Sequence, residues 1–238
     1  ALIASSPYTT KQISNRFDYT VSPRHSLFLR YTLDKNHGNG PIGAPTMPSN
    51  WLVNSNWSDQ SILGVTSILR PTLVNDFRFS YSWWKNRNLY PTTAECADCL
   101  GFDYPQVAIS GTNFVMGHTL NAPQGRDYRT YQWSDNMSWQ TGAHRFRFGG
   151  EWEMDITKGF WGFCDPACVT VYSLERTRQL APGIAVPSSI RTIQDILQLP
   201  VLSMTVGFGD PTSPAPYQQG NATHNHRIRV FWQDSWRL

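Results

Sequence analysis

The stretch QISNRFDYTV, residues 12–21, indicates the fold, because its apolar and polar side chains alternate along the chain. Ile13, Phe17 and Tyr19 share one face of an extended chain, and polar side chains share the other face. This period of two is typical of a β-strand with one apolar face and one face in water. A second alternating stretch, residues 26–34, follows the short turn SPRH, so the two stretches predict a β-hairpin.

The same hairpin unit recurs along the chain, separated by long irregular segments. Strands are predicted at residues 12–21, 26–34, 60–69, 74–85, 128–139, 144–154 and 227–238, and long loops at residues 35–59, 86–127 and 155–226. A strand of about ten residues tilted by roughly 45° rises about 23 Å, close to the apolar band of a transmembrane barrel. Short turns on one side and long loops on the other are typical of outer-membrane β-barrels. We therefore expect an all-β fold, in which residues 1–238 form a partial outer-membrane β-barrel domain. This domain would be an antiparallel up-and-down transmembrane β-barrel segment of about seven long strands.

Aromatic side chains dominate the apolar faces of the predicted strands. Those expected to face lipid are Phe17, Tyr19, Phe77, Phe79, Tyr81, Trp83, Phe146, Phe148 and Trp152. Trp133, Trp139 and Trp152 lie near predicted strand ends, where amphipathic rings favour the membrane–water interface. A secreted β-sandwich also alternates, with its aromatic residues in the core, so a soluble all-β fold stays open as the alternative.

Composition narrows the class of protein only a little. The 238 residues carry a formal net charge of +3, with lysines and arginines scattered along the strands, so we expect no nucleic-acid partner. No apolar run approaches the roughly 18 residues of a transmembrane helix. The chain starts without a signal peptide, so we expect a mature chain or an internal piece of one. An odd number of strands leaves open edges that are costly in lipid, so we expect a fragment of a larger barrel or pairing with other copies.

Four segments resemble, in the same order, the barrel of TonB-dependent, Oar-like outer-membrane receptors. They are NRFDYTVSPRHSLFLRYTLD (residues 15–34), SWQTGAHRFRFGGEWE (138–153), SIRTIQDILQLP (189–200) and RIRVFWQDSWRL (227–238). In that family a strand ending in Ser-Trp leads through a Gly-His turn to a Phe-x-Phe-Gly-Gly-Glu strand, which matches Ser138 to Glu151 here. The family's Asp-Phe-Leu-Leu-Gly-x-Pro-like loop element is similar to residues 195–200, which depart from it at the usual Phe and Gly.

This resemblance implies a larger protein and a function. It implies an N-terminal carboxypeptidase-regulatory-like domain, a plug and a barrel of about 22 strands, of which this chain would be roughly the middle third. The implied function is that of an outer-membrane receptor that binds and admits a bulky ligand, with its long loops extracellular and its ligand-binding residues unknown. The implied partners are outer-membrane lipid, the rest of its own barrel and plug, TonB, and an extracellular peptide, protein or glycan. The open alternative is a surface adhesin or a secreted β-sheet carbohydrate-binding protein.

Four cysteines lie in two of the long loops: Cys96, Cys99, Cys164 and Cys168. An even count in an exported chain predicts disulfides. Three pairings are possible, and proximity in the sequence favours Cys96 with Cys99 and Cys164 with Cys168. A zinc site built from the four thiolates is the alternative. An oxidising exterior and Pro166 inside the second pair argue against it.

Candidate catalytic and metal-binding groups are few. His224 and His226 precede the last strand and are a weak metal candidate. Three acids share a strand face with two arginines, which predicts lumen-facing charges that balance each other: Glu151, Glu153, Asp155, Arg145 and Arg147. We find no Gly-rich phosphate loop, Ser-His-Asp arrangement or H-E-x-x-H motif. We therefore expect no enzyme, no catalytic or metal-binding residues and no cofactor.

The long loops hold the remaining aromatic residues, and binding concentrates in loops. These residues are Trp51, Trp57, Tyr90, Phe102, Tyr104, Phe114, Phe160, Trp161 and Phe163. They either stack on a ligand or pack the loops on one another, and the second interpretation is favoured. A short helix is predicted over residues 188–198, with Ser188 as its N-cap.

Overall fold

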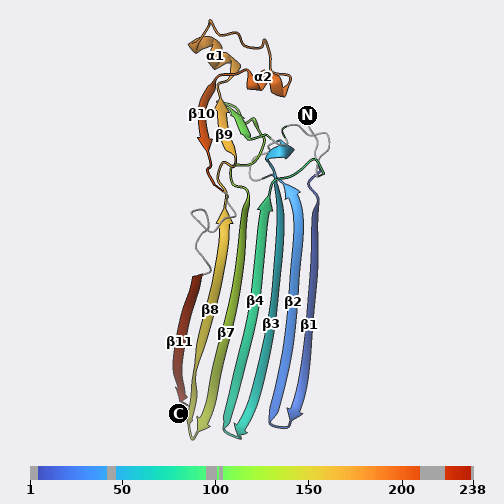
Figure 1. Ribbon diagram of the computed structural model, residues 1–238. Coiled ribbons are helices and arrows are strands. Elements are labelled where there is room, and N and C mark those ends of the chain that lie inside the picture. Colours follow the sequence, from blue (N-terminus) through green and yellow to red (C-terminus); the bar gives the residue numbers. More distant parts are fainter. Residues whose placement is uncertain (1–4, 42–46, 95–100, 102–103, 210–222, 237–238) are drawn as a thin grey trace.

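The computed structural model of the protein describes residues 5–41, 47–94, 101, 104–209 and 223–236. Seven strands lie side by side in one antiparallel sheet (Figure 1). They are β1 (Tyr8–Ser22), β2 (His25–Gly40), β3 (Leu52–Arg70), β4 (Leu73–Leu89), β7 (Gln124–Thr141), β8 (His144–Trp161) and β11 (Thr223–Trp236). Their order in space follows their order along the chain, which confirms the predicted up-and-down arrangement of seven long strands. Within the described residues the sheet does not close into a complete barrel.

Short turns join β1 to β2, β3 to β4 and β7 to β8, and all three lie at the same end of the sheet (Figure 1). Pro23 and Pro71 lie in the first two turns. The third contains Gly142 at a φ of 57°, a left-handed backbone conformation that glycine adopts without steric cost because it lacks a Cβ. We call this end of the sheet the turn end and the opposite end, which carries the long connections, the loop end.

The strands run farther toward the loop end than the alternation predicts. The predicted loops 35–59, 86–127 and 155–226 are therefore wrong at their borders, because β2, β4 and β8 end later and β3, β7 and β11 begin earlier than expected. Near the loop end polar side chains occupy both faces over parts of β2, β3 and β4, so the alternation weakens in the sequence. The backbone pairing of the sheet nevertheless continues there, because it needs no apolar face.

The register places side chains of all seven strands in rows across the sheet, since residues directly opposite each other share a face. One row is Phe17, Leu29, Leu63, Phe79, Trp133, Trp152 and Ile228, and the adjacent row on the other face is Arg16, Arg30, Ile62, Ser80, Gln132, Glu153 and Arg227. We call the face that carries Phe79 the outer face and the face that carries Ser80 the inner face. The register brings all of the side chains predicted to face lipid onto the outer face.

Aromatic rings fill the middle of the outer face. The ring centroids of Trp133 and Trp152 are 4.6 Å apart, and those of Phe79 and Trp133 are 5.2 Å apart. Such cross-strand aromatic pairs contribute about 0.5–1.5 kcal/mol each beyond the burial of their area. The expectation that Trp133 and Trp152 lie near strand ends is wrong: both lie in mid-strand, because the strands extend farther than predicted.

A second, smaller sheet lies beyond the loop end (Figure 1). It is formed by β5 (Gln106–Ile109), β6 (Val115–Met116), β9 (Ala167–Val171) and β10 (Val201–Val206), and it is accompanied by α1 (Leu174–Leu180) and α2 (Ile193–Leu197). Its core contains Val107, Ile109, Met116, Val171, Ile196 and Leu199. We call this unit the loop module. Because β5 and β9 pair in parallel, two of the predicted loops contribute regular structure that is not wholly antiparallel.

The helix predicted over residues 188–198 is shorter than expected. The N-cap of α2 is Thr192 and not Ser188. The Thr192 hydroxyl accepts a hydrogen bond from the Asp195 backbone N–H, and the Asp195 carboxylate accepts one from the Thr192 N–H at 2.8 Å. This capping box fixes the start of the helix. The backbone N–H groups of Arg191 and Thr192 also hold the pKa of Asp195 below its ordinary value. Among the described residues, no helix is both long and apolar enough to cross a membrane.

Candidate functional site: the polar inner face and the loop module

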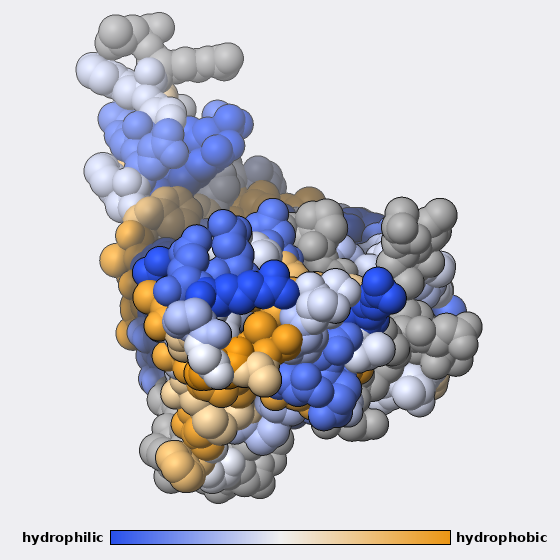
Figure 2. Space-filling model, turned by 90° about the horizontal axis from the view of Figure 1, so that it is seen from above, coloured by the Kyte–Doolittle hydropathy of each residue, from blue (hydrophilic) through white to orange (hydrophobic). Residues whose placement is uncertain are grey.

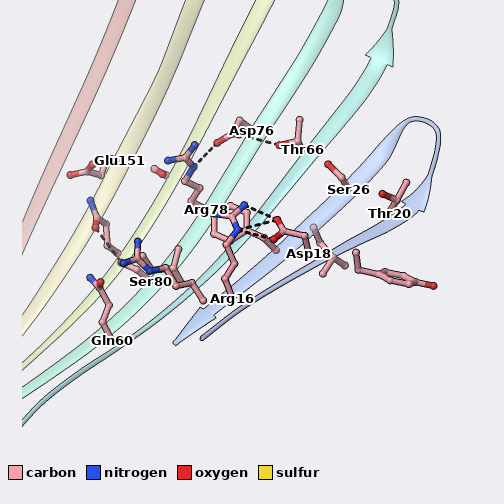
Figure 3. Close-up of a pocket in the computed structure, with 17 residues that line it drawn as sticks. Arg16, Asp18, Thr20, Ser26, Gln60, Thr66, Asp76, Arg78, Ser80 and Glu151 are labelled. Carbon is pink, nitrogen blue, oxygen red and sulfur yellow. Dashed lines mark hydrogen bonds and ion pairs between the residues drawn. The ribbon is translucent and has the colours of Figure 1, made fainter. Parts of the chain in front are cut away.

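The inner face is hollowed, and the hollow has a volume of about 860 Å³. Its lining comes from six neighbouring strands, β1 to β4, β7 and β8 (Figure 3). The labelled lining residues are mostly charged or polar: Arg16, Asp18, Thr20, Ser26, Gln60, Thr66, Asp76, Arg78, Ser80 and Glu151. The sheet therefore has one aromatic face and one charged, concave face, the division expected of a barrel wall with lipid on one side and water on the other.

Ion pairs within single strands line this hollow. An Arg16 guanidinium nitrogen lies 2.7 Å from Asp18 Oδ1 on β1, and Arg78 Nε lies 2.8 Å from Asp76 Oδ1 on β4 (Figure 3). The Thr66 hydroxyl lies 3.2 Å from the second oxygen of Asp76 and donates to it. Exposed pairs of this kind add little stability. Their main consequence is that the hollow presents both signs of charge.

A larger charge network joins β8 to β11. A guanidinium nitrogen of Arg227 lies 2.8 Å from Glu153 and also contacts Asp155, which is only 2% exposed. The guanidinium of Arg229 contacts Glu151 and lies 3.4 Å from Glu153. Because these pairs cross from one strand to the next, they fix the register of β11 against β8.

The prediction that Arg145 and Arg147 balance these acids is wrong. Arg145 and Arg147 share the inner face with them, but neither forms an ion pair within the part of the chain that the structure describes. The register of β8 with β11 places Glu153 directly opposite Arg227 and Glu151 opposite Arg229. Side chains directly opposite each other on adjacent strands are closer than residues farther along one strand, so the arginines of β11 reach the acids first.

An asparagine ladder crosses the inner face at the loop end. Its members, on β2, β3 and β4, are Asn36, Asn54, Asn56, Asn86 and Asn88. The Asn86 amide donates to Asn56 at 2.7 Å, and the Asn56 amide donates to Asn36 at 2.9 Å. Further amide–amide hydrogen bonds join the rest of the ladder. This ladder was not predicted, although asparagine at alternate positions of two paired strands is a signal that could have revealed it.

Tyr90 fastens the loop module to the sheet just beyond the end of β4. Its ring stacks on that of His118, with ring centroids 3.8 Å apart. Its hydroxyl lies within hydrogen-bond distance of the carbonyl oxygens of Ala122 and Asp165. Burial, together with the nearby Asp165 carboxylate, raises the pKa of Tyr90. The tyrosine is therefore a neutral hydrogen-bond donor at physiological pH.

A second anchor is the short 3-10 helix η1 (Pro48–Asn50), which leads into β3. The Ser49 hydroxyl accepts a hydrogen bond from the Gly117 N–H at 3.1 Å, and the Asn50 amide donates to the Gly117 carbonyl at 3.1 Å. Gly117 has a φ of 79°, and a Cβ there would lie 1.9 Å from the Pro105 carbonyl oxygen. Only glycine fits this position, so the contact constrains the sequence tightly.

The loop aromatics divide into packed and exposed groups. Trp51 is buried and Tyr90 is stacked, so both pack the loops on one another. Trp161 and Phe163 are 43% and 50% exposed, in an edge-to-face arrangement with centroids 6.1 Å apart. Viewed from above, hydrophobic residues (orange) gather mainly along the left margin, the side on which β8 and β10 lie in Figure 1 (Figure 2). Phe102 lies outside the described residues.

Cys164 and Cys168 form the predicted disulfide, which joins the segment after β8 to β9. Cys96 and Cys99 lie outside the described residues. Where the structure describes the chain, no three or more His, Cys, Asp or Glu residues gather into a group that could hold a metal ion. His226, the weak metal candidate, instead stacks on Trp152 of the outer face, with centroids 5.8 Å apart.

Comparisons with known proteins agree with this geometry. Residues 3–238 match the family model of the outer membrane beta barrel domain. The crystal structure of the outer membrane transporter YddB from Escherichia coli is similar, with a TM-score of 0.56 and 9% sequence identity, and the match covers 98% of this chain and 26% of that chain. At such low identity the likeness shows the fold alone. No curated protein sequence matches the chain significantly. Because the family model covers nearly the whole sequence, the protein belongs to the outer membrane beta barrel domain family of the bacterial outer membrane, where it associates with membrane lipid.

Proposed function

We propose that this domain is part of the barrel of a TonB-dependent, Oar-like outer-membrane receptor that binds a bulky extracellular ligand and admits it through the barrel. One observation supports this most strongly: a single continuous sheet has an aromatic outer face and a charged inner face around a hollow of about 860 Å³. A soluble sandwich would bury its aromatic face against a second sheet. In a membrane, the aromatic face lies in lipid and the charged face lines a path for a polar ligand. The proposal assigns no enzyme activity, cofactor or metal to the domain.

In this proposal the loop module faces the cell exterior and takes part in capturing the ligand. The module lies beyond the loop end (Figure 1), and the exposed rings of Trp161, at the end of β8, and Phe163 lie in the chain that leads into it. Aromatic rings with a free face can stack on a sugar or on a peptide side chain. The short turns face the periplasm, as is usual for barrels of this kind.

The open edges of the sheet support a larger barrel. No described strand pairs with the free edge of β1 or of β11. Each unpaired backbone group in lipid costs several kcal/mol. We therefore infer that both edges pair with further strands of the same barrel in the membrane, with the plug seated against the inner face.

Labelling of single cysteines tests the orientation. In the full-length protein that contains this sequence, Gln179→Cys in α1 and Arg24→Cys in the β1–β2 turn are exposed positions at opposite ends of the sheet. A membrane-impermeant maleimide should label the first in intact cells and the second only after the outer membrane is opened, relative to the parent protein. The reverse pattern would show that the long loops face the periplasm.

Binding of TonB tests the energy coupling separately. The purified full-length protein should bind the periplasmic domain of TonB in detergent, whereas the same protein without the segment ahead of its plug should not. A full-length protein that folds as a barrel but does not bind TonB would retain the barrel assignment and remove TonB coupling from the proposal.

A further inference from the structure

The outer face carries a basic groove at the loop end. Three lysines on three strands, Lys11, Lys35 and Lys85, lie in one row of the register, with Trp57 between the second and the third. Arg87 lies in the next row toward the loop end. Together they line a hollow with a volume of about 670 Å³. We call it the basic groove.

The lysines of the groove outnumber the nearby acids of the outer face, and those acids have other partners among the described residues. Lys11 and Lys35 are directly opposite each other, an arrangement that is destabilising for like charges on paired strands. Within the described residues, neither they nor Lys85 form an ion pair. On the outer face, Asp59 already accepts a hydrogen bond from the Trp57 indole at 3.1 Å. Asp127, directly opposite Lys85, accepts one from the Trp83 indole at 3.0 Å and lies 3.5 Å from Arg129 Nε. The groove therefore carries a concentration of positive charge that would favour the binding of an anion.

The position of the groove along the strands, at the border of the apolar part of the outer face, indicates the source of that anion. Leu33, which belongs to the apolar part of the outer face, is two residues from Lys35, about 7 Å along an extended strand. Trp57 and Trp83 lie at the same border, with ring centroids 6.3 Å apart. Aromatic rings gather at the membrane–water interface of barrels, at the level of the lipid headgroups. The Lys35 ammonium lies 5.0 Å from the centre of the Trp57 ring, so the two groups share this level.

We propose that the basic groove binds the phosphate-bearing headgroup of a membrane lipid that packs its acyl chains against the outer face. Lys11, Lys35 and Lys85 supply the charge for a phosphate, and Arg87 adds a guanidinium. Trp57 and Leu89 supply the apolar lining against which the start of an acyl chain or a sugar ring packs. The inference rests on the proposed membrane orientation, and it names the outer leaflet as the source of the lipid, because the groove lies at the loop end.

The test uses the full-length protein in detergent, with lipid A, a phosphorylated glycolipid, as the probe and native mass spectrometry as the readout. We expect lipid A to bind more tightly than the zwitterionic phosphatidylcholine. A lysine near a charged lipid surface contributes about a fivefold change in affinity, so Lys35→Gln with Lys85→Gln should weaken lipid A binding by about 25-fold. Lys158→Gln is the matched control, because this exposed lysine shares the row of the groove but lies on the far side of Asp127 from Lys85, outside the lining.

The possible outcomes separate the alternatives. Equal binding of lipid A to the double variant and the parent protein would overturn the proposal. A loss of affinity in Lys158→Gln as large as that in the double variant would also overturn it, because it would show that lipid A responds to the overall positive charge and not to a defined site. Displacement of the lipid by millimolar inorganic phosphate would show a site for free phosphate and would overturn the lipid assignment. A protein that stays folded without detergent would refute the proposed membrane function itself, whereas a detergent-dependent barrel with unselective lipid binding would refute this inference alone.

Discussion

Replacing Phe79 with arginine tests the assignment of the outer face most directly. Phe79 lies near the middle of β4, between Leu63 on β3 and Trp133 on β7. An arginine that faces lipid at the midplane of a barrel costs about 2–4 kcal/mol. Loss of the aromatic pair with Trp133, whose ring centroid is 5.2 Å away, adds about 0.5–1.5 kcal/mol. We expect the free energy of unfolding of the full-length protein to fall by about 3–5 kcal/mol.

The matched control is Ser80→Arg, the next residue along β4 and therefore at nearly the same depth on the inner face. It loses the hydrogen bond from the Ser80 hydroxyl to Gln132 at 3.2 Å, which costs about 0.5–1.5 kcal/mol, and its new charge lies in a polar hollow. Both variants are unfolded with guanidinium chloride in phosphatidylcholine vesicles, and unfolding is followed by tryptophan fluorescence. Equal costs for the two variants, or a larger cost for Ser80→Arg, would refute the assignment of the two faces.

Three further predictions concern the β8–β11 contact and the loop module. Asp155→Ala should lower the free energy of unfolding by about 1–3 kcal/mol, because a buried acceptor of the Arg227 guanidinium is lost; a change below about 0.5 kcal/mol in the same titration would contradict this. Replacing Cys164 and Cys168 with serine removes a disulfide that closes a short loop and contributes about 2 kcal/mol of stability. Limited proteolysis should therefore cut the loop module faster and leave the long strands intact. Because burial raises the pKa of Tyr90, its stabilising effect is complete below the ordinary tyrosine pKa of about 10 and declines as the pH rises above it. Near-ultraviolet circular dichroism should show this alkaline loss of structure in the parent protein and a smaller one in Tyr90→Phe.

The long strands could be predicted from the sequence because their environment imposes a simple rule. Wherever one face meets an apolar medium and the other meets water, side chains alternate, as they do from Gln12 to Val21 and from Asp76 to Trp83. The rule fails at the loop end. From Asn54 to Asn56 both faces carry polar side chains, and the strand continues there on backbone pairing and on the asparagine ladder. Sequence reasoning therefore found the strands and misplaced their ends.

Contacts between strands far apart in the chain could not be predicted from the sequence, for a different reason. Arg227 and Glu153 are close only because β11 pairs with β8 in one particular register, and a shift by one residue would move Arg227 to the outer face. The pattern within β8 shows charges on one face but not the strand that neutralises them. The loop module was missed because its strands are short and its core residues are dispersed between Val107 and Leu199.

The loop module also shows how a binding surface above a barrel can be held in place. Its core of six buried apolar residues is too small to fold stably alone, since domains this small generally need staples or partners. The Cys164–Cys168 disulfide and the contacts of Tyr90 and Asn50 supply those constraints, and the latter two connect the module to the ends of β4 and β3. The module therefore takes its position from the barrel strands.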